Sequence, residues 1–365
     1  MEIARDLVGL HGTDAASVFL AVWARMPAAQ SSAIEQALYD DRVLLRMLGM
    51  RRTMFVVPRD LAPLMHAACT KTIAVRERRK LVQLLEGAGV SSDAKRWLIE
   101  VENATLRALG VRGEALAAQL SQDVPALRHQ IVFGEGTKWQ GRQALSTRVL
   151  FMLAADARIV RARPRGSWTS TQYRWALIDS WLRGEMEEWA TDSARVELIR
   201  RWLAAFGPGT VADLKWWTGL TVGEVKRALE KIETAEVEID GGPGLVLAHD
   251  LEPVLDLEPW VALLPALDPT VMGWSQRQWY LGDHGRALFD RTGNAGPTVW
   301  CAGRIVGGWA HRKDGRVAVR LLEDVGREAA SMIEETAERL GEWLGPVRVT
   351  PRFRTPLERE LSGQR

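Results

Sequence analysis

Basic residues with aromatic residues among them are concentrated between positions 138 and 174. Eight Lys and Arg residues stand here against the single acid Asp156, so the net charge of the stretch is +7. Arginine holds phosphate oxygens through several N–H donors, and phosphate contacts supply much of the affinity of proteins for nucleic acid. The stretch therefore predicts a surface that follows a sugar–phosphate backbone; a solvated face above core tryptophans is the alternative. The residues that we expect to contact DNA here are Lys138, Trp139, Arg148, Arg161, Arg163, Arg165, Trp168 and Arg174.

The segment 210–248 has the pattern of a helix–turn–helix followed by a hairpin. Thr210 and Thr221 are suitable N-cap residues for its two helices, and a glycine-rich turn joins two short β-type runs. This order is that of a winged helix, a DNA-binding unit. The second helix mixes acids with bases, so we expect this unit to be mainly scaffold. The expected elements are helices over 211–217 and 222–232 and strands over 237–239 and 245–247.

Two other segments have a similar order of elements, which predicts three such units in series. In the N-terminal unit, the turn 49–52 joins the two strands and carries Arg51 and Arg52, which we expect to contact phosphates. Its elements are a helix over 14–26, a second helix capped by Ser31 or Ser32, and strands over 43–48 and 53–57. The middle unit is expected to hold helices over 95–109, 112–120 and 143–155 and a hairpin of 159–162 with 168–173, and the third unit also has a helix over 193–205.

The C-terminal part has short apolar runs separated by glycine-containing turns, which is typical of a small β-barrel or curved sheet with one helix across it. Strands are expected over 260–264, 298–301, 304–309, 317–321 and 347–349, with a helix over 325–344. The predicted fold class is therefore α+β, mainly helical, with three tandem winged-helix units followed by a small C-terminal β-barrel. The expected domains are residues 1–90, 91–180, 181–252 and 253–365.

The composition is that of an ordinary globular protein. The net charge of the 365 residues is only +2, so a nucleic-acid surface must be local. Cys69 and Cys301 are far apart, and the histidines show no metal-ligand spacing, so we expect no disulfide framework, no metal and no cofactor. No apolar run approaches the roughly 18 residues of a membrane span, and no leader precedes Leu7. We expect a monomeric, cytoplasmic protein associated with the nucleoid.

Several short motifs resemble those of the AlkZ-like (YcaQ-like) DNA glycosylases, in the order and spacing of that family. They are Leu-Val-Gly-Leu-His-Gly-Thr-Asp at 7–14, Met-Leu-Gly-Met-Arg-Arg-Thr-Met-Phe-Val-Val-Pro at 47–58, Gly-Ser-Trp at 166–168, Tyr-Arg-Trp at 173–175 and Leu-Pro-Ala-Leu-Asp-Pro at 264–269. The resemblance covers nearly the whole chain. It implies three winged helices with a C-terminal β-barrel, and excision of alkylated or bulky-adducted purines from double-stranded DNA, in base excision repair or in self-resistance to a genotoxin.

The catalytic motif of that family is Gln, an apolar residue and Gln directly after Gly-Leu, whereas this chain has His11, Gly12 and Thr13. An N3- or N7-alkylated purine already carries positive charge and leaves without a strong general acid. The enzyme must then position water and stabilise an oxocarbenium-like sugar. A neutral His11 can accept a proton from that water, Thr13 offers a hydroxyl, and Asp14 brings a carboxylate that the cationic sugar favours.

The same residues have a structural interpretation. Thr13 is a good N-cap for a helix that begins at Asp14, and His11 can be an ordinary loop histidine. Asp268, before Pro269, is expected to start a turn rather than to supply an acid. The alternative function is accordingly a catalytically inactive winged-helix protein that binds DNA as a regulator or in lesion recognition.

Overall fold

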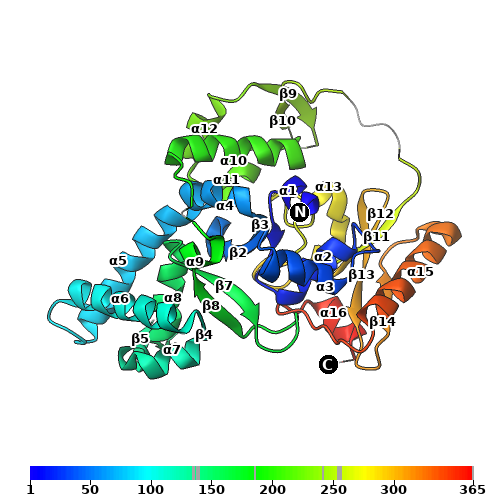
Figure 1. Cartoon of the computed structure of the whole chain (residues 1–365). Helices are drawn as coiled ribbons and strands as arrows, with labels where there is room; N and C mark the ends of the chain where they lie inside the picture. The colour runs from blue at the N-terminus through cyan, green and yellow to red at the C-terminus, as the bar shows by residue number, and fades with distance from the viewer. Residues whose placement is uncertain (134–135, 137–139, 185, 241, 253–256, 364–365) are drawn as a thin grey trace. The chain divides into compact units, whose positions relative to one another are not determined.

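The computed structural model describes residues 1–133, 136, 140–184, 186–240, 242–252 and 257–363 (Figure 1). The chain divides into two compact units. Unit 1 is Glu35–Leu198 together with Met1, and unit 2 is Glu2–Ile34 together with Ile199–Arg365. Helices and strands are mixed in both, which confirms the predicted mixed α and β content. None of the helices in the described ranges combines the length and apolar character that a membrane crossing requires.

Unit 1 is a helical layer beside small antiparallel sheets. Its main core lies where α5, α6, α7 and α8 meet, around Leu85, Leu98, Leu120 and Leu153. Its strands form the pair β2–β3, a three-stranded sheet in the order β4–β8–β7, and the pair β5–β6. The helices are α4 (Ala62–Met65), α5 (Lys71–Gly87), α6 (Ala94–Arg112), α7 (Ala117–Asp123), α8 (Leu145–Ala155) and α9 (Ile178–Leu182); the strands are β2 (Leu44–Leu48), β3 (Met54–Pro58), β4 (Glu114–Leu116), β5 (Gln130–Phe133), β6 (Gly141–Ala144), β7 (Ile159–Pro164) and β8 (Tyr173–Leu177).

Unit 2 joins the N-terminal segment to the C-terminal half of the chain. A four-stranded antiparallel sheet in the order β11–β12–β13–β14 packs against α15, as Figure 1 shows. Its elements are α1 (Glu2–Asp6), β1 (Leu10–His11), α2 (Ala15–Trp23), α11 (Val211–Thr218), α12 (Val222–Leu229), β9 (Thr234–Ile239), β10 (Gly242–Leu247), β11 (Val261–Leu264), α13 (Gln278–Leu281), α14 (Gly285–Leu288), β12 (Thr298–Cys301), β13 (Arg304–His311), β14 (Val317–Leu321), α15 (Gly326–Leu344) and α16 (Pro356–Leu361); α3 (Ser31–Glu35) and α10 (Thr191–Phe206) span the two divisions between the units.

The expected elements of segment 210–248 are confirmed with small shifts. Thr210 and Thr221 cap α11 and α12, and in each case the acid three residues later completes a capping box. Helix α12 ends at Leu229, three residues earlier than expected. Strands β9 and β10 pair antiparallel, with Val237 opposite Gly244.

Several local expectations are wrong. The helix expected over 112–120 forms only from Ala117, as α7, because α6 runs to Arg112, Gly113 then adopts φ 71° and the chain first enters β4. Strand β8 begins at Tyr173, so Trp168 lies in the connection rather than in a strand. The N-cap of α2 is Asp14, with extended φ and ψ of −96° and 127°, rather than Thr13.

The C-terminal strands over 298–301 and 317–321 are confirmed as β12 and β14, but the barrel is not. Among the described strands, β11 and β14 form the two edges of an open sheet. No strand forms over 347–349; the backbone N–H of Val349 donates to His311 Nδ1 at 3.3 Å instead of joining a ladder. The second N-terminal helix begins at Ser31, so Ser31 and Ser32 lie within it and neither is its cap.

Candidate functional site

The segment His11–Asp14 runs from the end of β1 to the start of α2 and is held mainly by the Asp14 side chain. The Asp14 carboxylate accepts two hydrogen bonds: Oδ1 from the N–H of Ala16 at 3.0 Å, and Oδ2 from the N–H of Arg352 at 2.8 Å. The first bond caps α2, and the second attaches the segment to the chain just before α16. The Arg352 guanidinium also donates to the carbonyl oxygen of Thr13 at 3.5 Å. Asp14 therefore orders the segment whatever its chemical role.

The three candidate catalytic side chains differ in their access to solvent. His11 and Asp14 are only 6% and 7% exposed, whereas Thr13 is half-buried. The Nδ1 atom of His11 lies 3.5 Å from the backbone N–H of Thr13, a long hydrogen bond. The Thr13 N–H is the donor, so in this contact Nδ1 is the accepting ring nitrogen.

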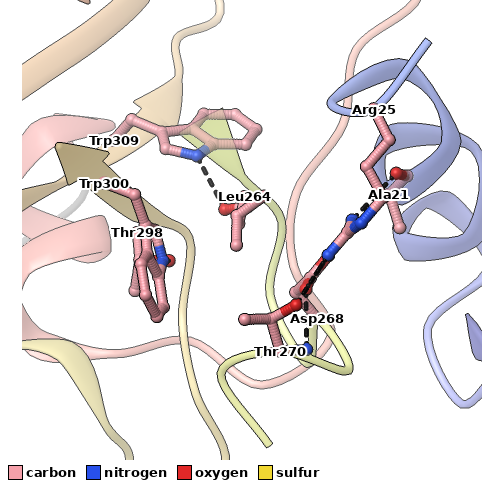
Figure 2. Close-up of polar contacts among 8 residues, drawn as sticks. All are labelled: Ala21, Arg25, Leu264, Asp268, Thr270, Thr298, Trp300 and Trp309. Atoms are coloured by element: carbon pink, nitrogen blue, oxygen red, sulfur yellow. Dashed lines mark hydrogen bonds and ion pairs between the residues drawn. The ribbon is translucent and has the colours of Figure 1, made fainter. Parts of the chain in front are cut away.

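Helix α2 is anchored at its C-terminal end by a buried ion pair, which Figure 2 shows. The Arg25 guanidinium donates to both oxygens of Asp268, at 2.9 and 2.8 Å, and to Thr270 Oγ1 at 2.8 Å. Asp268 Oδ1 also accepts from the N–H of Thr270 at 2.9 Å, so Asp268 does begin a turn, as expected. Burial lowers the pKa of Arg25, but the attraction of Asp268 outweighs it and raises that pKa overall. The pair holds α2, and with it the His11–Asp14 segment, on the C-terminal part of unit 2.

In unit 1, Arg161 and Arg163 share one face of β7, and both lie against aromatic rings. The Arg161 guanidinium lies 5.2 Å from the Tyr173 ring centroid and 5.4 Å from that of Trp175. Arg163 pairs with Asp40 at 2.7 Å and with Glu35 at 3.4 Å. Two carboxylates thus offset the charge of Arg163 within the protein.

The remaining predicted DNA contacts have diverse surroundings. Arg51 and Arg52 adopt positive φ angles of 52° and 65° in the turn between β2 and β3, and Arg52 pairs with Glu77 at 3.1 Å. Arg165 is exposed in the connection between β7 and β8, while Trp168 in the same connection is 7% exposed. Half-buried positions are occupied by Arg148 and Arg174, and Lys138 and Trp139 lie outside the described residues.

Two features of unit 2 were missed by the sequence analysis. One is a wide hollow of about 870 Å³, whose lining includes Arg286, Arg291, Arg352, Arg354 and Arg359; we call it the arginine hollow. The other is a pocket of about 370 Å³ with Trp274 and Trp279 in its wall. The cluster of arginines at 348–359 was a visible signal, but its approach to residues 286–291 depends on the fold. In the described ranges, no three His, Cys, Asp or Glu side chains are grouped to hold a metal ion.

Comparison with known proteins gives the family. The family model for DNA glycosylase AlkZ-like proteins matches residues 4–343. Among solved structures, the Streptomyces sahachiroi DNA glycosylase AlkZ is similar, with a TM-score of 0.67 and 19% sequence identity over 96% of this chain and 92% of that one. No curated protein sequence matches the chain. Because the family match covers most of its 365 residues, this chain belongs to the AlkZ-like DNA glycosylase family.

Proposed function

We propose that this protein is a monofunctional DNA glycosylase that hydrolyses the N-glycosidic bond of alkylated or bulky-adducted purines in double-stranded DNA. Membership of the AlkZ-like family over residues 4–343 carries the proposal. The protein would act in base excision repair or in self-resistance to a genotoxin. We expect it to work as a monomer, without cofactor or metal.

The reaction does not need a strong general acid. Alkylation at N3 or N7 places a positive charge on the purine, so the base leaves as a neutral molecule when the C1′–N bond breaks. The sugar becomes oxocarbenium-like and is attacked by water, which must lose a proton. The enzyme lowers the barrier by orienting that water and by placing negative charge near the sugar.

We assign the proton-accepting role to His11. In a neutral imidazole one ring nitrogen donates and the other accepts, and the backbone N–H of Thr13 approaches Nδ1 at 3.5 Å, which favours Nδ1 as the accepting nitrogen. The accepting nitrogen would take the proton of the attacking water. Thr13 would orient that water through its hydroxyl group. Asp14, held in place by the N–H groups of Ala16 and Arg352, would stabilise the cationic sugar electrostatically.

DNA binding would involve three winged-helix units followed by the open C-terminal sheet β11–β12–β13–β14, in the four domains 1–90, 91–180, 181–252 and 253–365. The pair α11–α12 with the β9–β10 hairpin supports a winged helix at 210–248, with Thr210 and Thr221 as its helix caps. The proposed phosphate contacts are Arg51, Arg52 and the predicted residues of the middle unit other than Arg163. Exposed Arg165 is the best placed of them, because Asp40 and Glu35 already compensate Arg163.

The test is excision from a duplex that carries a single N7-alkylguanine, scored as alkali-labile abasic sites. We expect His11→Ala to lower the excision rate by about 10²–10⁴-fold, the usual contribution of a positioned acid–base group, and to leave duplex affinity nearly unchanged. His11→Gln introduces the family residue at this position and should restore part of the rate. Equal activity of wild type and His11→Ala would refute the assignment of His11.

The second candidate function is DNA binding without catalysis, and one observation favours it. Both oxygens of Asp14 accept backbone N–H groups, so its carboxylate already has a structural function, and neither family glutamine is present. In that case neither the wild type nor the His11→Gln, Thr13→Gln double variant would release any base, although both would bind duplex DNA.

A further inference from the structure

The arginine hollow brings together two distant stretches of unit 2. One wall comes from α14 and the turn that follows it, including Arg286 and Arg291. The other comes from the segment leading into α16, including Arg352, and from α16 itself, including Arg359. The hollow measures about 870 Å³ and is wide open, so it is an extended surface rather than an enclosed pocket.

The hollow carries an uncompensated positive charge. Arg354 is paired with Glu358, its Nε atom lying 2.6 Å from Oε2. The side chains of Arg286, Arg291, Arg352 and Arg359 are exposed, and no carboxylate in the described ranges forms an ion pair with any of them. Four like charges around one hollow repel one another unless an anion lies among them.

The acids near the hollow cancel only part of this charge. Asp290, in the lining, accepts hydrogen bonds from Thr292 and Asn294 at 2.8–2.9 Å. Its carboxylate is therefore turned toward its own loop. Glu360, on α16, pairs with Arg320 at 2.7 Å. The four exposed guanidinium groups thus remain available to an incoming ligand.

The lining suits a phosphodiester chain better than a single small anion. Each guanidinium group can hold a phosphate with two parallel N–H donors, and several spread over an open surface match a repeated charge. Phe289 and Phe353 add apolar surface between the arginines, against which sugars can pack. The hollow also adjoins the candidate catalytic segment, because Arg352 bonds to Asp14 and Thr13.

We propose that the arginine hollow binds the sugar–phosphate backbone of duplex DNA beside the His11–Asp14 segment. The inference rests on the proposed function only in taking DNA as the ligand, and it requires no base excision. It assigns phosphate contacts to Arg286, Arg291 and Arg359, and to the side chain of Arg352.

The test compares two variants with the same change in charge. The first replaces three arginines of the hollow (Arg286→Gln, Arg291→Gln, Arg359→Gln), and the control replaces three exposed basic residues of unit 2 away from it (Lys313→Gln, Arg316→Gln, Arg327→Gln). The Kd for an undamaged fluorescent duplex is measured by anisotropy as a function of salt. Each lost phosphate contact lowers the slope of log Kd against log salt by about one. For the hollow variant we expect this slope to fall by up to about three and the duplex to bind at least tenfold more weakly. For the control variant we expect little change in either quantity.

Several outcomes would overturn the inference. One is a hollow variant whose slope equals that of the wild type; another is a control variant that loses as much slope as the hollow variant. A third is a hollow variant that loses protection by inorganic phosphate in thermal unfolding but keeps its duplex affinity, which would assign the site to a free anion. Excision is measured separately, so a protein that binds DNA through the hollow but releases no base would refute the proposed function alone.

Discussion

The ion pair between Arg25 and Asp268 gives the sharpest prediction for stability (Figure 2). Asp268 is fully buried and Arg25 is 22% exposed, so Asp268→Ala leaves a largely buried guanidinium without its carboxylate. Removing one partner of a buried pair costs about 3–5 kcal/mol, and the partial exposure of Arg25 favours the lower end, about 3 kcal/mol. Arg25→Ala should lower the free energy of unfolding by at least as much, because it leaves the Asp268 carboxylate unpaired and without access to solvent.

The assay is urea unfolding followed by tryptophan fluorescence, with the transition of each unit fitted separately. The matched control is Glu100→Ala, which breaks an Arg96–Glu100 pair of similar length, 3.1 Å, whose side chains are 78% and 61% exposed. That control should change the free energy of unfolding by less than about 0.5 kcal/mol. The double variant Arg25→Met, Asp268→Leu should cost less than either single change, since it leaves no buried charge. If Asp268→Ala were as mild as the control, the claim that this pair anchors α2 would fail.

Two further predictions concern charge. Arg165→Ala should lower the slope of log Kd against log salt for duplex binding by about one. Arg163→Ala should leave that slope unchanged and instead lower the free energy of unfolding, because Asp40 and Glu35 lose their partner. The reverse pattern would contradict this interpretation. Burial raises the pKa of Asp213, but hydrogen bonds from Thr210, Gln276 and Ser275 outweigh it and lower that pKa overall. The unfolded state therefore binds the proton first, so Asp213 stabilises the fold above its unfolded pKa of about 3.9 and this contribution is lost as the pH falls through the folded value. The stability difference between wild type and Asp213→Ala, measured by urea unfolding from pH 7 to pH 3, should shrink at the acid end; a constant difference would exclude this linkage.

Local signals in the sequence predicted local structure well. The caps at Thr210 and Thr221 depend on a side chain and a backbone N–H three residues apart, so the sequence alone contains both partners. Strands β12 and β14 were found because apolar runs between turn residues also need no distant information. The cap of α2 was misassigned because Thr13 and Asp14 are both good caps, and only the backbone angles at Asp14 decide between them.

What the sequence could not supply was the approach of residues far apart in the chain. Arg25 and Asp268 are separated by 243 positions, and no periodicity or motif links them. The role of Arg163 was missed for the same reason, since its partners Glu35 and Asp40 lie more than 120 residues away. A run of arginines predicts positive charge, but only the fold decides whether that charge faces a carboxylate of the same protein or remains available to a ligand.

Arg352 connects the two proposals for unit 2 through different parts of one residue. Its backbone N–H donates to Asp14, while its guanidinium lines the arginine hollow and reaches the carbonyl oxygen of Thr13. A phosphate bound by this guanidinium would lie next to the segment whose side chains are proposed to act on the sugar. Its negative charge would add to that of Asp14 in favouring an oxocarbenium-like sugar nearby. Under the two proposals together, the DNA backbone oriented by Arg352 would supply part of the transition-state stabilisation in a chain that lacks both family glutamines.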